Sequence, residues 1–158
     1  MTHRELCIKG AKFLKNQGIF AFHKCRYVVC ELERAGESPD AFGWVGGVTQ
    51  LIEVKVTRSD FLSDKKKMWR MNPNQGLGKF RSYLCPEGII KESDLPENWG
   101  LLYINDKGKI YSVKEPISQE SDHYEEIDLI TSILRREGFN PQIFSYKKYK
   151  ADTVSTEC

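Results

Sequence analysis

The pair Gly46-Gly47 constrains the fold of this chain more than any other feature, because it separates two stretches rich in β-forming residues. A loop of two glycines suits the type I′ turn of a β-hairpin, in which both central residues need positive φ angles. The sequence therefore predicts two antiparallel strands, over residues 39–45 and 48–56.

The register of this hairpin brings two acidic side chains together. If Val45 pairs with Val48, Asp40 lies directly opposite Glu53, with the two Cβ atoms about 5 Å apart. Like charges in such positions are destabilising, unless one acid is protonated, both point into water, or a cation lies between them. Lys55 is one such cation, since it follows on the same face of the strand as Glu53.

A divalent metal between Asp40 and Glu53 is the fullest of these solutions, because Mg²⁺ takes oxygen ligands from one or two carboxylates and keeps several waters. Such a metal would polarise a phosphate oxygen and activate a bound water, which Lys55 could orient or deprotonate. An acid pair for glycoside hydrolysis has the same geometry but leaves Lys55 without a role. An exposed strand face that carries Glu and Lys is the purely structural alternative.

Basic residues are concentrated after this strand, although the net charge of the whole chain is only +2. Residues 55–81 carry eight basic and two acidic side chains, a charge of +6, so the remainder of the chain sums to −4. This pattern is typical of a protein that binds a polyanion, although a solvated helix face produces it too. The candidate phosphate contacts are Arg58, Lys65, Lys66, Lys67, Arg70, Lys79 and Arg81.

Hydrophobic periodicity predicts one α/β domain with a mixed sheet. The expected helices cover residues 3–17, 59–71 and about 121–138, and the further strands cover residues 25–33, 80–86, 99–104 and 109–114. Thr2 and Ser59 are the expected N-caps of the first two helices, and Ser121 or Asp122 caps the last. The expected core face of the last helix is formed by Ile127, Ile130, Ile133 and Leu134.

The 158 residues suffice for a single domain, which we expect over residues 1–146, followed by a polar tail over residues 147–158. No apolar run approaches the roughly 20 residues of a membrane helix, and no signal-peptide core is seen, so we expect a cytoplasmic protein without a membrane partner. Five cysteines without a Cys-x-x-Cys pair do not predict a zinc site, which would require convergence with His3, His23 or His123.

The stretches "SPDAFGW" and "LIEVKV", with twelve residues between Asp40 and Glu53, resemble the Pro-Asp…(Asp/Glu)-x-Lys signature of the PD-(D/E)XK nuclease superfamily. The longer segment from about Glu31 to Ile104 is similar to small bacterial and phage proteins related to the MmcB-like DNA-repair proteins. The resemblance implies a three-layer α/β/α, restriction-endonuclease-like core around a mixed central sheet.

The same resemblance implies roles for individual residues. Asp40 and Glu53 would be metal ligands, together with the backbone carbonyl of Val54, and Lys55 would be the catalytic lysine. The superfamily often adds a glutamate from the first helix.

Two glutamates are candidates for that additional ligand. Glu5 lies on the first helix, although the pattern Thr2-His-Arg-Glu5 also forms a capping box that occupies its carboxylate. Glu31 lies on the strand before the motif and could face the same side.

We therefore expect a metal-dependent nuclease that uses Mg²⁺ or Mn²⁺ to hydrolyse DNA in repair, recombination or phage DNA processing. A non-catalytic nucleic-acid-binding module with the same fold is the alternative. RNA stays open as a substrate, because nothing in the sequence addresses the 2′-hydroxyl. Little of the chain remains for a separate recognition module, so sequence-specific cutting would need a homodimer or a protein partner.

Overall fold

The computed structural model describes residues 1–21 and 23–139, and the expected tail over residues 147–158 lies outside them. Within the described residues, six strands form one sheet in chain order. They are β1 (Tyr27–Cys30), β2 (Ala41–Val45), β3 (Val48–Val54), β4 (Phe80–Pro86), β5 (Gly100–Ile104) and β6 (Ile110–Lys114). The pairs β3–β4 and β4–β5 are parallel and the other pairs are antiparallel, so the sheet is mixed as predicted.

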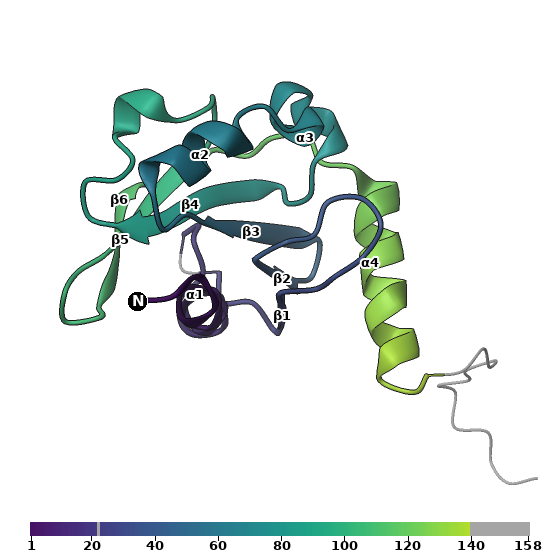
Figure 1. Cartoon of the computed structure of the whole chain (residues 1–158). Coiled ribbons are helices and arrows are strands. Elements are labelled where there is room, and N and C mark those ends of the chain that lie inside the picture. The colour runs from purple at the N-terminus through teal and green to yellow at the C-terminus, as the bar shows by residue number, and fades with distance from the viewer. Residues whose placement is uncertain (22, 140–158) are drawn as a thin grey trace, which may run out of the picture.

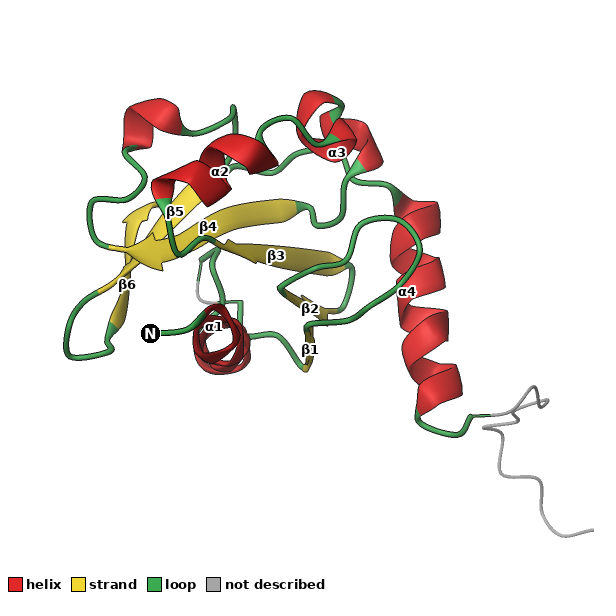
Figure 2. Ribbon diagram, viewed as in Figure 1, coloured by secondary structure: helices red, strands yellow, loops and turns green. Residues whose placement is uncertain are grey.

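Helices cover both faces of this sheet, which confirms the predicted three-layer α/β/α architecture. Helix α1 (His3–Asn16) crosses one face, while α2 (Arg58–Asp64) and α3 (Met68–Met71) lie over the other (Figures 1 and 2). Helix α4 (His123–Arg136) stands at the side of the sheet, and short 3₁₀ turns occur at Pro73–Gln75 and Glu92–Asp94.

Each helical layer packs on its own apolar cluster. Beneath α1 the buried core includes Leu6, Leu14, Ile52, Val54 and Leu84. The opposite cluster is richer in aromatic residues and includes Phe42, Phe61, Tyr83, Trp99 and Leu129. Because β3 contributes to both clusters and is buried throughout most of its length, polar residues on it need partners inside the protein.

The predicted register of the β2–β3 hairpin is confirmed. Val45 pairs with Val48, and the pairing continues to Ala41 opposite Ile52. The turn differs from the prediction in one respect, since Gly46 alone of the two glycines has a positive φ, at 56°. The type I′ turn, which requires positive φ at both central residues, is therefore wrong, although the loop length is right.

The predicted helix over residues 59–71 is wrong in its start and its continuity. Its N-cap is Thr57, whose hydroxyl accepts a hydrogen bond from the Asp60 N–H at 3.1 Å. The helix ends at Asp64, and Lys67 is extended, with φ −67° and ψ 143°, before α3 begins. The break lets Asp64 and Arg70, six positions apart, both turn toward the interior.

The predicted core face of α4 is only partly correct. Ile130 and Ile133 pack against the core, and Leu129 is fully buried, but Ile127 is 63% exposed and Leu134 is 44% exposed. The helix is capped by Asp122, one of the two residues expected.

The exposure of Ile127 and Leu134 follows from the surface that α4 packs against. Instead of lying flat on the sheet, the helix contacts the connection between β1 and β2. The Arg34 guanidinium forms ion pairs with Glu125 at 2.7 Å and Asp128 at 2.9 Å. Arg136 donates a hydrogen bond to the Glu33 carbonyl at 2.6 Å. A helix held at its side in this way leaves more of its apolar surface exposed than one that covers a sheet.

No helix among residues 1–21 and 23–139 has the length and apolar character needed to cross a bilayer.

Candidate active site

Asp40 lies where β2 begins, one position beyond the last hairpin pair, and therefore beside Glu53. Its Oδ2 accepts a hydrogen bond from the Val54 N–H at 2.8 Å, which fixes the carboxylate against β3. Burial raises the pKa of Asp40 to about 6, and the nearby Glu53 carboxylate raises it as well. The two acids are thus close enough to repel each other, as the hairpin register predicts.

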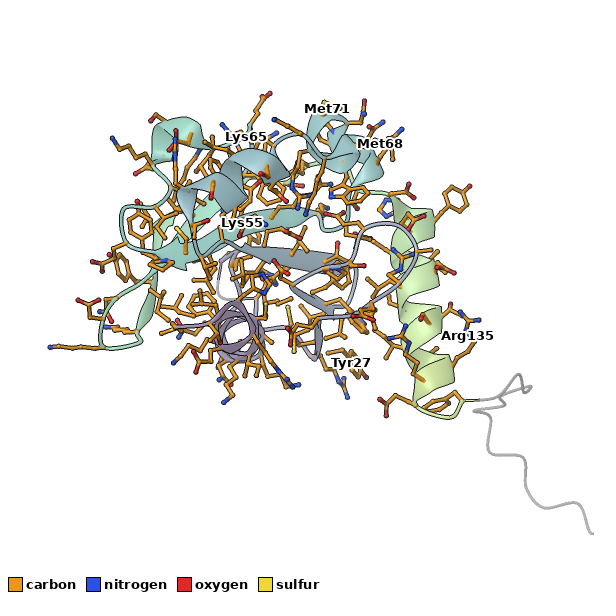
Figure 3. All side chains as sticks on the ribbon, viewed as in Figure 1. Tyr27, Lys55, Lys65, Met68, Met71 and Arg135 are labelled. Atoms are coloured by element: carbon orange, nitrogen blue, oxygen red, sulfur yellow. The ribbon has the colours of Figure 1, made fainter. Side chains whose placement is uncertain are left out.

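The side chains of Glu53 and Lys55 lie on the same side, as predicted, although Lys55 is one residue past the end of β3. Lys55 Nζ lies 3.3 Å from Glu53 Oε2 and 3.3 Å from Asp64 Oδ1. Burial lowers the pKa of Lys55, but the surrounding carboxylates, led by Glu53 and Asp64, outweigh burial and raise it. Lys55 is therefore an ammonium ion in this environment. In Figure 3 it lies beneath α2.

Arg70 is the second buried cation of the site. Its guanidinium reaches Glu37 Oε1 at 2.6 Å, Glu53 Oε2 at 3.1 Å and Asp64 Oδ2 at 2.8 Å. It also stacks over the Trp99 ring, with 4.7 Å between the guanidinium carbon and the ring centroid. The Arg70 guanidinium thus forms ion pairs with three carboxylates. These ion pairs, together with packing, hold α3 against the sheet.

Asp64 joins Lys55 to Arg70. Its Oδ2 accepts a hydrogen bond from the Tyr83 hydroxyl at 2.8 Å, and its Oδ1 lies 2.8 Å from Lys67 Nζ at the surface. Burial would raise the pKa of Asp64, but Arg70 and Lys55 hold it well below its usual range. This carboxyl is therefore ionised throughout the neutral range.

Acidic side chains outnumber buried cations at this end of the sheet. The acids are Glu37, Asp40, Glu53 and Asp64, and the buried cations are Lys55 and Arg70. If all six groups are ionised, their formal charge is −2, which Lys67 offsets only from the surface. A site with excess negative charge suits a divalent cation.

One carboxylate oxygen of Glu53 is available to a hard metal ion. Within the described residues, both ion pairs of Glu53 use Oε2, so Oε1 remains for a ligand. As these side chains are oriented, no group of three His, Cys, Asp or Glu ligand atoms within 4.8 Å in the described part of the chain includes Asp40 or Glu53. In this orientation a Mg²⁺ ion would take at most two side-chain carboxylates here, with water completing its coordination.

Two of the predicted phosphate contacts are contradicted by the structure. Arg70 is buried in the network described above. Arg81 is fully buried and donates hydrogen bonds to backbone carbonyls, including those of Gly78 at 2.8 Å and Glu120 at 2.7 Å. A guanidinium that satisfies carbonyls inside the protein cannot reach a polyanion. The sequence could not separate these arginines from the surface lysines, because charge alone does not report burial.

The remaining basic candidates lie at the surface. Lys65, Lys66 and Lys79 are exposed, and Lys67 is exposed apart from its contact with Asp64. Arg58 forms a two-pronged ion pair with Asp94 at the surface. The charges that face outward over α2 and α3 are therefore mainly lysines.

Two exposed methionines accompany these lysines. Met68 and Met71 are 55% and 66% exposed. Figure 3 shows both at α3, on the outer side of the helical layer. This surface thus combines positive charge with apolar area.

The two additional ligand candidates have different surroundings. The Glu5 carboxylate accepts a hydrogen bond from the Thr2 N–H at 2.7 Å and completes a capping box. None of its described contacts is with Asp40 or Glu53. Glu31 does not lie on a strand as expected, because β1 ends at Cys30 and Glu31 has a φ of +50°. Its N–H nevertheless bonds to the Asp40 carbonyl at 3.1 Å, so it lies close to the site.

Sequence reasoning missed Glu37 and the central position of Asp64. Glu37 precedes Ser38-Pro39 in a turn, where acids are ordinary, yet it is 4% exposed. Its Oε2 accepts a hydrogen bond from the Leu77 N–H at 2.7 Å. Burial raises its pKa even though Arg70 lies beside it. No local pattern distinguishes this glutamate, because its partners are 33 and 40 residues away.

A cavity of about 720 Å³ lies elsewhere, between the β2–β3 turn and the start of α4, and its lining includes Trp44, Thr49, Lys79 and Glu126. Neither Asp40 nor Lys55 lines it, so this cavity is separate from the buried acidic network.

No protein-family model matches the chain, and no curated protein matches it. The chain is similar in structure to the SPO1766 protein of unknown function from Silicibacter pomeroyi. The TM-score is 0.61 at 22% sequence identity, and the match covers 87% of this chain and 90% of the other. At this identity the likeness supports the fold alone.

Proposed function

We propose that this protein is a metal-dependent nuclease of the PD-(D/E)XK superfamily that hydrolyses phosphodiester bonds in DNA. The observation that carries the proposal is the pairing of Asp40, whose pKa is raised to about 6, with Glu53 and the buried ammonium of Lys55. A protein that needed only an ion pair at this place would not add a carboxyl whose charge is unfavourable.

Asp40 and Glu53 would hold the metal, with the Val54 carbonyl beside them. A bound Mg²⁺ or Mn²⁺ would supply Lewis acidity and lower the pKa of a bound water. Lys55, held as an ammonium by Glu53 and Asp64, would orient the attacking water and stabilise negative charge on the phosphoryl oxygens. Its raised pKa makes it a donor rather than a base.

Arg70 acts as a positioning residue in this scheme. By binding Glu53 through Oε2 it directs the other carboxylate oxygen away from the guanidinium. Glu37 and Asp64 hold Arg70 in turn. A site built from such a network needs little rearrangement when its ligand binds.

The surface lysines between α2 and α3 supply the attraction for a polyanion. Lys65 and Lys66 are exposed on the helical layer that covers Lys55. Contacts of this kind with phosphate position a nucleic acid without reading its sequence. DNA is the substrate we favour, and cutting at defined sequences would rely on a second copy or another protein.

A non-catalytic nucleic-acid-binding module is the second candidate, and one observation favours it. Glu53 already faces two cations, Lys55 at 3.3 Å and Arg70 at 3.1 Å. In such a module the network would only stabilise the fold, and Mg²⁺ would change neither DNA binding nor stability.

The experiment that separates the two is a cleavage assay on labelled single-stranded, duplex and flapped DNA, with a matching RNA, in Mg²⁺ or Mn²⁺. A nuclease cleaves at least one substrate, and loses activity in EDTA and in the Asp40→Asn and Lys55→Met variants. Lys107→Met, in an exposed turn, is the matched control and keeps full activity. Cleavage that survives Asp40→Asn, or a protein that binds DNA but cuts none of these substrates, would contradict the proposal.

A further inference from the structure

A second group of metal-ligating side chains lies on the other side of Asp40. Among the described residues, His3, Cys7 and Glu31 form a group of three His, Cys, Asp or Glu side chains whose ligand atoms all lie within 4.8 Å of one another. His3 and Cys7 are four residues apart on α1, so they share one face of the helix. Glu31 comes from the end of β1, where its φ of +50° turns the chain.

The separations suit tetrahedral zinc. Zn–S and Zn–N bonds of about 2.3 and 2.0 Å at the tetrahedral angle put the two ligand atoms about 3.5 Å apart. Cys7 Sγ lies 3.4 Å from His3 Nδ1. The two atoms form a hydrogen bond in the metal-free protein, and a carboxylate oxygen of Glu31 lies within 4.8 Å of both.

The second nitrogen of His3 is also placed as a metal ligand requires. His3 Nε2 lies 3.4 Å from Asp40 Oδ1. A histidine that binds metal through one ring nitrogen commonly donates the other N–H to a carboxylate, which fixes the tautomer and ring orientation. Asp40 is in that position, and His3 Nδ1 thereby faces Cys7.

The Cys7 thiol is neutral in the metal-free protein and would lose its proton only on binding a metal. Cys7 is fully buried, and burial, followed by the charges of Asp40 and Glu31, raises its pKa. A metal-free thiolate would be unfavourable among these acids. A dication replaces the thiol proton, which is released to solvent on binding, and neutralises the carboxylate of Glu31.

We propose that His3 Nδ1, Cys7 Sγ and a carboxylate oxygen of Glu31 form a binding site for a borderline divalent metal ion, with Zn²⁺ as the natural occupant. Thiolate and imidazole ligands select Zn²⁺ over Mg²⁺, so this site is chemically distinct from the hard-metal site at Asp40 and Glu53. Three protein ligands leave one position for water, which is the arrangement of zinc sites with an open position. The His3 and Glu31 side chains are 42% and 39% exposed, so that position is reached from solvent.

The test is a titration of the full, metal-free chain with Co²⁺, the spectroscopic substitute for Zn²⁺, followed by absorption spectroscopy. We expect a sulfur-to-cobalt charge-transfer band that saturates with one equivalent bound at this site, and Zn²⁺ to displace it. The band disappears in Cys7→Ser, whereas Cys85→Ser, a buried thiol of the opposite core cluster, retains it.

Substitution of the buried Cys7 could prevent folding, so two surface variants complete the test. His3→Ala and Glu31→Gln lower the Co²⁺ affinity at least tenfold, while His123→Ala, on the exposed start of α4, leaves it unchanged. Absence of a charge-transfer band in the wild type, or a band that survives Cys7→Ser, would overturn the inference. Nuclease activity is not the readout, so a failure here leaves the proposed function standing, and the reverse also holds.

Discussion

Replacing Asp40 by asparagine should make the metal-free protein more stable. The carboxyl is held beside Glu53 with little access to solvent, and its pKa is raised from 3.8 to about 6. Asparagine keeps an oxygen that can accept the Val54 N–H bond but carries no charge. A substitution that abolishes cleavage while stabilising the fold is the expected signature of a functional charge rather than a structural one.

The size of the stability gain follows from the raised pKa of Asp40. An acid whose folded pKa is above its unfolded value destabilises the protein at pH values above both, and the cost disappears once the pH falls below the unfolded pKa. The change from 3.8 to about 6 corresponds to a cost of ~3 kcal/mol. Because the asparagine amide must still be partly desolvated, we expect a gain of about 1–3 kcal/mol.

Thermal unfolding in EDTA measures this gain. For a domain of this size each kcal/mol raises Tm by about 2–4 °C. The difference between Asp40→Asn and wild type should be largest at about pH 8 and should shrink as the pH falls through about 6 toward 4. Asp106→Asn, in an exposed turn, is the control and should leave Tm unchanged. A lower Tm for Asp40→Asn at about pH 8, or a gain that does not depend on pH, would refute the reasoning.

Three further predictions concern the network and the surface. Arg70→Ala removes the cation shared by buried carboxylates and should lower the free energy of unfolding by about 3–5 kcal/mol. Arg58→Ala removes an exposed ion pair and should cost much less, and equal losses in chemical denaturation would contradict this contrast. Charge removal at the three lysines 65–67 should weaken DNA binding and reduce the slope of log K against log[salt] by up to about 3, whereas an unchanged slope in fluorescence anisotropy would exclude this surface. Glu5→Gln should retain metal-dependent cleavage, because its carboxylate caps α1; loss of cleavage would make Glu5 a ligand instead.

The β2–β3 hairpin shows what local sequence can predict. Two adjacent glycines set the loop length, and alternation along the strands then decided which side chains face each other. Asp40, Glu53 and Lys55 could be placed together on that basis alone. The capping box of α1 is equally local, since Thr2 and Glu5 are only three residues apart.

The partners of this hairpin could not be predicted in the same way. Arg70 sits among Glu37, Glu53 and Asp64 because the helix after β3 breaks at residues 65–67. Helical periodicity continues through those lysines, so the pattern predicts one helix and an exposed arginine. The break lets Arg70 neutralise a buried carboxylate cluster, and most of that cluster is distant from Arg70 in sequence.

The prediction of the core face of α4 was partly wrong for a related reason. Its apolar residues repeat at helical spacing whether it lies flat on a sheet or stands at its side. Arg34 draws α4 toward the β1–β2 connection through Glu125 and Asp128, and Ile127 is thereby left exposed. The cluster of His3, Cys7 and Glu31 could not be predicted either. Glu31 is distant from the other two residues in sequence, and only the tertiary structure brings it next to α1.

The measurement that tests the central claim most directly is a calorimetric titration of Mg²⁺ or Mn²⁺ into the wild type and Asp40→Asn. If Asp40 and Glu53 bind the metal, the wild type has one site whose affinity rises with pH through about 6, as Asp40 ionises, and the variant has lost it. Absence of binding in the wild type, or equal affinity in the variant, would contradict the account and leave the network a purely structural one.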